Sequence, residues 1–98
     1  MTDYSEILRL ATIINAPDEY FTPGKAKAFE ADLEGLSRDD MALCCVASKL
    51  LAGRGYSISS DNPETFAKYR ALAEHMGATV STPGSPPRQI VLSPPPKH

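Results

Sequence analysis

The 98-residue sequence predicts an α+β domain in which three helices precede a β-α-β-β unit. In the first half of the chain, apolar residues recur at helical spacing in three segments. The second half holds one further segment of this kind between short runs that alternate between apolar and polar residues. Prolines and glycines separate the segments. A chain of this length is expected to form one domain, which we place at residues 1–93.

The first two helices are predicted from apolar stripes and from the positions of prolines. Residues 3–15 carry apolar side chains at helical spacing, and Pro17 ends that segment because proline disfavours helical geometry at the preceding residue. Thr22 and Pro23 have the residue types of an N-cap and of a first helical position. The helix that they open ends at Gly35. Its apolar stripe consists of Ala26, Phe29, Leu33 and Leu36.

The third helix, predicted over residues 38–52, has the most apolar sequence of the chain. Ser37 and Asp40 have the spacing of a capping box with aspartate in place of glutamate, and Gly53 is suited to end the helix. Apolar residues occur on every side of this segment, so we expect it at the centre of the fold. The side chains expected to be most buried include Met41, Leu43, Val46, Leu50 and Leu51.

The second half of the chain predicts strands at residues 56–59, 78–82 and 89–93, with a helix at 63–77. The two later strands flank a loop rich in proline and glycine and should pair as an antiparallel hairpin. A helix joins the first and second strands, which allows them to lie parallel through a right-handed crossover and gives a small mixed sheet. Residues 94–98 favour polyproline geometry and are expected to form a flexible tail.

The residue inventory contains no arrangement typical of an active site. His75 is an internal histidine on the polar side of its predicted helix and lacks the partners of a catalytic triad. Cys44 and Cys45 are adjacent, which gives poor disulfide geometry, and no second cysteine pair stands at zinc-finger spacing. We expect both thiols to be reduced and largely buried. We expect no catalytic residue, no metal site and no cofactor.

The N-terminal residues and the apolar runs do not have the patterns of export or membrane insertion. Residues 1–6 are acidic, whereas a secretory signal needs a basic start. The longest apolar stretch, residues 41–47, is far shorter than the about 20 residues that span a bilayer. We therefore expect a cytoplasmic protein without a membrane segment.

Charge is distributed unevenly along the chain. Residues 1–40 hold nine acidic and four basic side chains, whereas residues 41–98 hold three acidic and six basic ones. Such an asymmetry can steer a charged partner. The predicted acidic face consists of Glu30, Asp32, Glu34, Asp39 and Asp40. The sequence thus favours a small non-enzymatic protein-binding module, an accessory or inhibitory regulator of a larger protein complex.

A winged-helix-like DNA-binding regulator is the alternative. In that arrangement the helix at residues 63–77 enters the major groove, and the hairpin at residues 78–93 reaches the phosphate backbone. Lys68, Arg70 and Arg88 would contact phosphates. A formal net charge of −2 opposes this alternative, because nucleic-acid binders carry a basic footprint.

The loop at residues 83–88 also matches the P-x-x-P-x-R pattern that aromatic grooves recognise in a polyproline helix. Two flanking strands restrain this loop, so a turn is the preferred interpretation.

Overall fold

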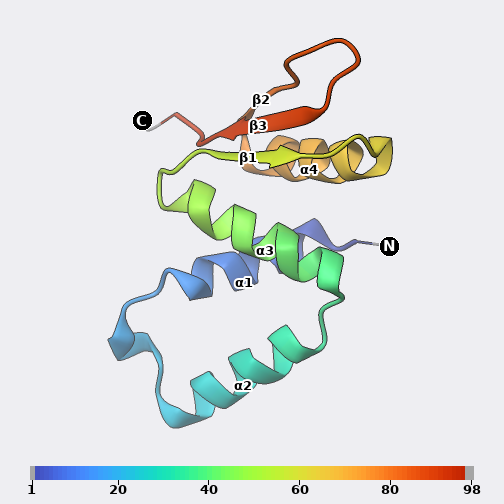
Figure 1. The fold of residues 1–98 in the computed structure, drawn as a ribbon. Coiled ribbons are helices and arrows are strands. Elements are labelled where there is room, and N and C mark those ends of the chain that lie inside the picture. The colour runs from blue at the N-terminus through green and yellow to red at the C-terminus, as the bar shows by residue number, and fades with distance from the viewer. Residues whose placement is uncertain (1, 97–98) are drawn as a thin grey trace. The chain divides into compact units, whose positions relative to one another are not determined.

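The computed structural model describes residues 2–96 and divides at Ser48 into two compact units (Figure 1). The helices are α1 (Tyr4–Ile14), α2 (Pro23–Glu34), α3 (Arg38–Leu51) and α4 (Pro63–Met76), with a short 3-10 helix, η1 (Asp18–Tyr20). The strands are β1 (Tyr56–Ser59), β2 (Thr79–Ser81) and β3 (Gln89–Ser93). This order confirms the predicted α+β class. Over the described residues, no helix has both the length and the apolar character needed to cross a bilayer.

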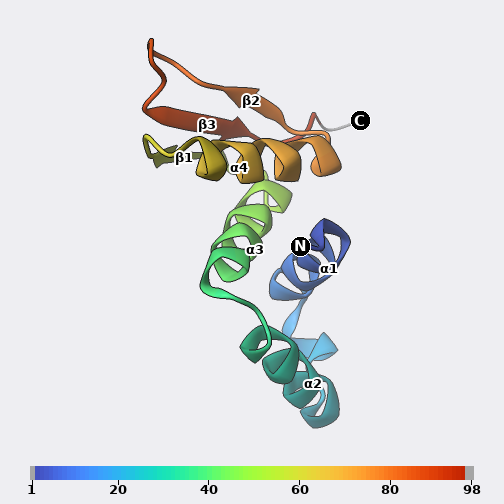
Figure 2. The same ribbon diagram turned by 90° about the vertical axis from the view of Figure 1, so that its right-hand side faces the viewer.

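In the first unit, α1 and α3 lie side by side and are joined at both ends (Figures 1 and 2). Near their N-terminal ends, the Thr2 hydroxyl donates to Oδ1 of Asp40 at 3.3 Å. Near their C-terminal ends, the side-chain amide of Asn15 donates to the carbonyl oxygen of Ser48 at 2.8 Å. The two helices therefore run in the same direction. They supply the buried side chains of this unit, which are Ile7, Leu10, Ala11, Leu43, Cys44, Val46 and Ala47.

α2 forms where it was predicted but contributes no buried residue. Its apolar stripe is only half-buried, although the helix contacts α1. An aromatic cluster lies at its N-terminal end. The ring of Phe21 lies 5.3 Å from that of Tyr20 and 5.9 Å from that of Phe29, and Lys25 Nζ lies 4.5 Å from the Tyr20 ring.

α3 is less enclosed than its apolar sequence predicts. Leu43, Val46 and Leu50 are buried, as expected. Met41 is half-buried, and Leu51 is 45% exposed, so the prediction of burial is wrong for Leu51. The physical reason is helical geometry, because adjacent positions diverge by about 100° and neighbouring residues on this helix therefore face different surroundings.

Within residues 49–96, the second unit forms a three-stranded sheet in which β3 is central. β3 pairs antiparallel with both β1 and β2, which confirms the predicted hairpin of β2 and β3. The prediction of a mixed sheet is wrong, because β3 separates β1 from β2 and no parallel pair forms. β3 is the longest strand and carries the fully buried Ile90 and Leu92, which suits the central position.

The two faces of the sheet differ in composition. The inner face carries Tyr56, Ile58, Val80, Ile90 and Leu92, and α4 contacts β2 and β3 on this side through its own buried residues. The outer face carries five hydroxyl side chains with one glutamine and one valine, namely Ser57, Ser59, Thr79, Ser81, Ser93, Gln89 and Val91. The outer face is therefore polar but without charge. Residues 84–87 form the predicted turn between β2 and β3.

Replacing Leu50 by alanine is expected to lower the free energy of unfolding by about 2 to 5 kcal/mol, because the side chain is fully buried. Leu51→Ala is the matched control. It removes the same atoms from the adjacent, exposed position and should cost less than about 1 kcal/mol. Urea unfolding followed by circular dichroism measures both values. Equal losses would contradict the different burial of these two leucines.

Candidate functional site

The predicted acidic face lies in the first unit, but its carboxylates do not share one surface. Residues two apart on a helix diverge by about 200°, so Asp32 points to the opposite side of α2 from Glu30 and Glu34. Asp39 and Asp40 lie in the first turn of α3. The five residues therefore fall into three groups with different surroundings.

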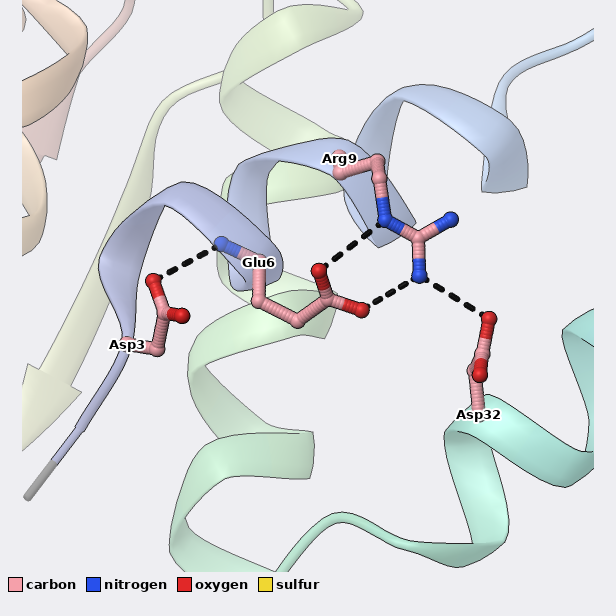
Figure 3. Close-up of polar contacts among 4 residues, drawn as sticks. All are labelled: Asp3, Glu6, Arg9 and Asp32. Carbon is pink, nitrogen blue, oxygen red and sulfur yellow. Dashed lines mark hydrogen bonds and ion pairs between the residues drawn. The ribbon is translucent and has the colours of Figure 1, made fainter.

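Asp32 is held by Arg9 of α1 (Figure 3). The Arg9 guanidinium donates to Oδ2 of Asp32 at 2.9 Å, and its Nε donates to Oε2 of Glu6 at 3.0 Å. A second contact joins Arg9 to Oε1 of Glu6. Asp3 caps α1 by accepting a hydrogen bond from the backbone N–H of Glu6 at 3.2 Å. The charge of Asp32 is thus compensated, and its role is to join α2 to α1.

These contacts shift the pKa values of two groups. The hydrogen bond from Arg9 lowers the pKa of Glu6, and hydrogen bonds to Glu6 and Asp32 raise the pKa of Arg9. The side chains of Glu6, Arg9 and Asp32 remain 40 to 48% exposed, so solvent screens their ion pairs. The network therefore helps to orient α2 relative to α1 but contributes little to the stability of the unit.

Asp39 and Asp40 lie in the first turn of α3, where their carboxylates have a structural explanation. The backbone N–H of Asp40 donates to Oγ of Ser37 at 3.1 Å, which confirms Ser37 as the predicted cap. The side chain of Asp40 accepts from Thr2, and negative charge in a first turn complements the helix dipole. These two carboxylates therefore have structural roles.

Glu30 and Glu34 lie one turn apart on α2, and both are exposed. Neither glutamate takes part in the ion pairs that Arg9 forms with Glu6 and Asp32. Both lie beside the half-buried apolar stripe. We call the combination the α2 surface, which consists of Ala26, Phe29, Glu30, Leu33, Glu34 and Leu36.

Sequence reasoning missed the residues that bind Asp32. Glu6 and Arg9 stand three residues apart, a spacing that itself predicts an ion pair on one helix. The contact of Arg9 with Asp32 spans 23 residues, and no local pattern indicates it. The structure thereby removes Asp32 from the candidate surface.

The candidate phosphate-binding residues in the second unit do not converge. Lys68 is half-buried and has an interaction within the fold, whereas Arg70 is exposed on nearly the opposite side of α4. Arg88 lies at the end of the hairpin loop, where its carbonyl oxygen accepts from the N–H of Ser60 at 2.9 Å. Strand β1, rather than a helix and a short turn, precedes α4. α4 is therefore not preceded by the helix and short turn that come before the recognition helix of a helix-turn-helix motif.

A half-open pocket of about 250 Å³ lies in the second unit, beside the described part of the predicted tail. Pro94 and Pro95 are half-buried there. The pocket is lined by Leu50, Leu51, Gly53, Pro94, Pro95 and Pro96. These residues offer no polar side chain that would orient a small ligand. Lys97 and His98 of the tail lie outside the described residues.

The two cysteines are chemically different. Cys44 is buried, and burial raises the pKa of its thiol to about 11, with a further contribution from the charge of Cys45. Cys45 is exposed, so the prediction that both thiols are buried is wrong for Cys45. The two side chains diverge around α3, which explains the difference. Among the residues that the structure describes, no three His, Cys, Asp or Glu side chains are grouped to hold a metal ion.

Alkylation of the native protein at neutral pH should modify Cys45 quickly and Cys44 at least about tenfold more slowly, because the buried thiol stays protonated. Mass spectrometry of timed reactions with iodoacetamide measures both rates. Cys45→Ser should remove the fast reaction, and Cys44→Ser should preserve it. Fast reaction at both thiols in the native protein would show that Cys44 is accessible.

Replacing Arg9 by glutamine is expected to raise the pKa of Glu6 toward its ordinary value, because the hydrogen bond from Arg9 lowers it. A carboxyl with a lowered folded-state pKa stabilises the fold above its unfolded pKa, and that contribution is lost as the pH falls through the folded pKa. NMR titration of the Glu6 carboxyl measures the shift. Lys27→Gln, which removes the same charge from α2, should leave this pKa unchanged. An unaltered pKa in Arg9→Gln would refute the contact.

No protein family model, curated protein or solved structure matches this chain. Its function is therefore inferred from its own residues and geometry.

Proposed function

We propose that this chain is a non-enzymatic protein-binding module that contacts a larger protein through the α2 surface and acts as an accessory or inhibitory regulator. One observation carries the proposal. α2 is a 12-residue helix with an apolar stripe, yet none of its residues is buried. An amphipathic helix in a soluble domain ordinarily directs such a stripe into a core.

The partner that suits this surface is a protein with an apolar groove and a basic rim. Phe29 and Leu33 stand one turn apart on α2, a spacing with which helices enter grooves, and Leu36 follows directly after the helix. Covering these side chains removes further apolar surface from water. Glu30 and Glu34 would meet lysines or arginines on the rim. Because a single helix offers a small contact area, we expect moderate affinity.

The charge of the first unit supports the same kind of partner. No charged residue occurs between positions 41 and 48, so residues 1–48 hold the nine acidic and four basic side chains of the acidic half. A net charge of this size attracts a basic surface over a distance and raises the association rate more than the final affinity. DNA, by contrast, would be repelled by this unit.

The proposal places the module in the cytoplasm. Cys44 and Cys45 are both free thiols, which suits a reducing compartment.

Affinity capture of the tagged chain from native cell extract, with and without nuclease, is the first test. We expect a protein partner that survives nuclease treatment. Association of the purified partner is then compared between two double variants of this chain that have the same change in charge. Glu30→Lys with Glu34→Lys alters the α2 surface, and Glu64→Lys with Glu74→Lys alters exposed carboxylates of α4.

The first pair should slow association by about tenfold at low salt, and the second pair should have little effect. Surface plasmon resonance at two salt concentrations measures both association rates. Equal rates for the two variants would eliminate the α2 surface as the contact. Loss of every partner after nuclease treatment would favour nucleic acid.

A further inference from the structure

Three of the helices have stabilised ends. α1, α3 and α4 each begin with a side chain that accepts a hydrogen bond from a first-turn N–H, namely Asp3, Ser37 and Asn62. Each of these helices carries an acidic residue in its first turn. α3 and α4 also have a basic residue in the last turn, and α4 ends at Gly77 with a positive φ of 73°. These features complement the helix dipole and satisfy the end groups.

α2 departs from this pattern at both ends. Its N-cap, Thr22, makes no side-chain hydrogen bond, and the first turn contains Gly24 and Lys25 but no acidic residue. The last turn contains Glu34 and no basic residue. Positive charge at the start and negative charge at the end both oppose the helix dipole, and glycine weakens a helix. Helices shorter than about 12 to 15 residues are marginal on their own in water.

Packing compensates for these weaknesses only in part, through the ring contact of Phe29 with Phe21 near the start of the helix. α2 has no buried residue, and the side chains of the ion pair that joins it to α1 are 43 to 48% exposed. α1, by comparison, buries Ile7, Leu10 and Ala11. Local unfolding is easiest where few apolar contacts are buried and the local helix preference is weak.

We propose that α2 is a conformational lid, which unfolds and refolds as a separate unit while α1 and α3 stay folded. The contact of Arg9 with Asp32 is the latch of this lid. Opening releases Arg9 and uncovers the side of α1 that α2 contacts. The charge pattern sets the position of the equilibrium, because the charges at both ends of α2 favour the open form. This lid belongs to the free protein and does not depend on the proposed partner.

Hydrogen exchange of the full chain, followed by NMR, tests the lid directly. Amides within residues 27–34 of α2 should exchange at least about 100-fold faster than those of Ile7 to Ala11 in α1, after correction for intrinsic rates. The exchange of α1 amides should instead follow global unfolding in urea. Equal protection of α1 and α2, with both lost in one transition, would overturn the proposal.

Position 24 permits a matched test of the cause. A Cβ atom at Gly24 meets nothing within 4 Å, so larger side chains fit there. Gly24→Glu and Gly24→Lys introduce residues of similar helix propensity and opposite charge. The α2 amides of Gly24→Glu should exchange about 2- to 5-fold more slowly than those of Gly24→Lys, with α1 unchanged in both.

If global unfolding governed exchange in α2, the α1 amides would change by the same factor as the α2 amides. Parallel changes in α1 and α2 would overturn the lid, and equal exchange of α2 in the two variants would overturn its electrostatic origin.

Discussion

The parallel pairing of α1 with α3 is the constraint on which the first unit depends. Hydrogen bonds at both ends fix these helices in the same direction, so the chain must travel back along the pair before α3 can begin. α1 has 11 residues and is therefore about 16 Å long. α2 has 12 residues and covers that return distance. Its place is thus set by chain connectivity, which explains how a regular helix can form without a buried side.

The elements of this fold could be predicted from local sequence signals. Periodicity located the helices, and the proline and glycine positions located their ends and the hairpin. The order of the strands could not be predicted in this way, because pairing of β1 with β3 joins residues 30 to 36 positions apart. The exposure of Leu51 and Cys45 was missed for a related reason. A sequence that is apolar on every side does not say which side has neighbours.

In the candidate site, too, local sequence signals located some residues, whereas the role of another depends on a tertiary contact. Glu30 and Glu34 could be found from sequence, because they stand one turn apart on the polar side of a predicted amphipathic helix, where charged side chains are expected to stay exposed. Asp32 has the same residue type and the same helix, but its role depends on Arg9 in another helix. Charge composition therefore selected the candidate segment, and tertiary contacts decided which of its carboxylates remain exposed.

The two edge strands of the sheet have a consequence for self-association. Exposed edge strands present unpaired backbone groups, and many proteins protect them with lysine or proline. β1 and β2 form the edges here and contain neither residue. Their protection is shortness, since they are only four and three residues long. Insertions that lengthen either strand would thus create a template for fibril-like pairing between molecules.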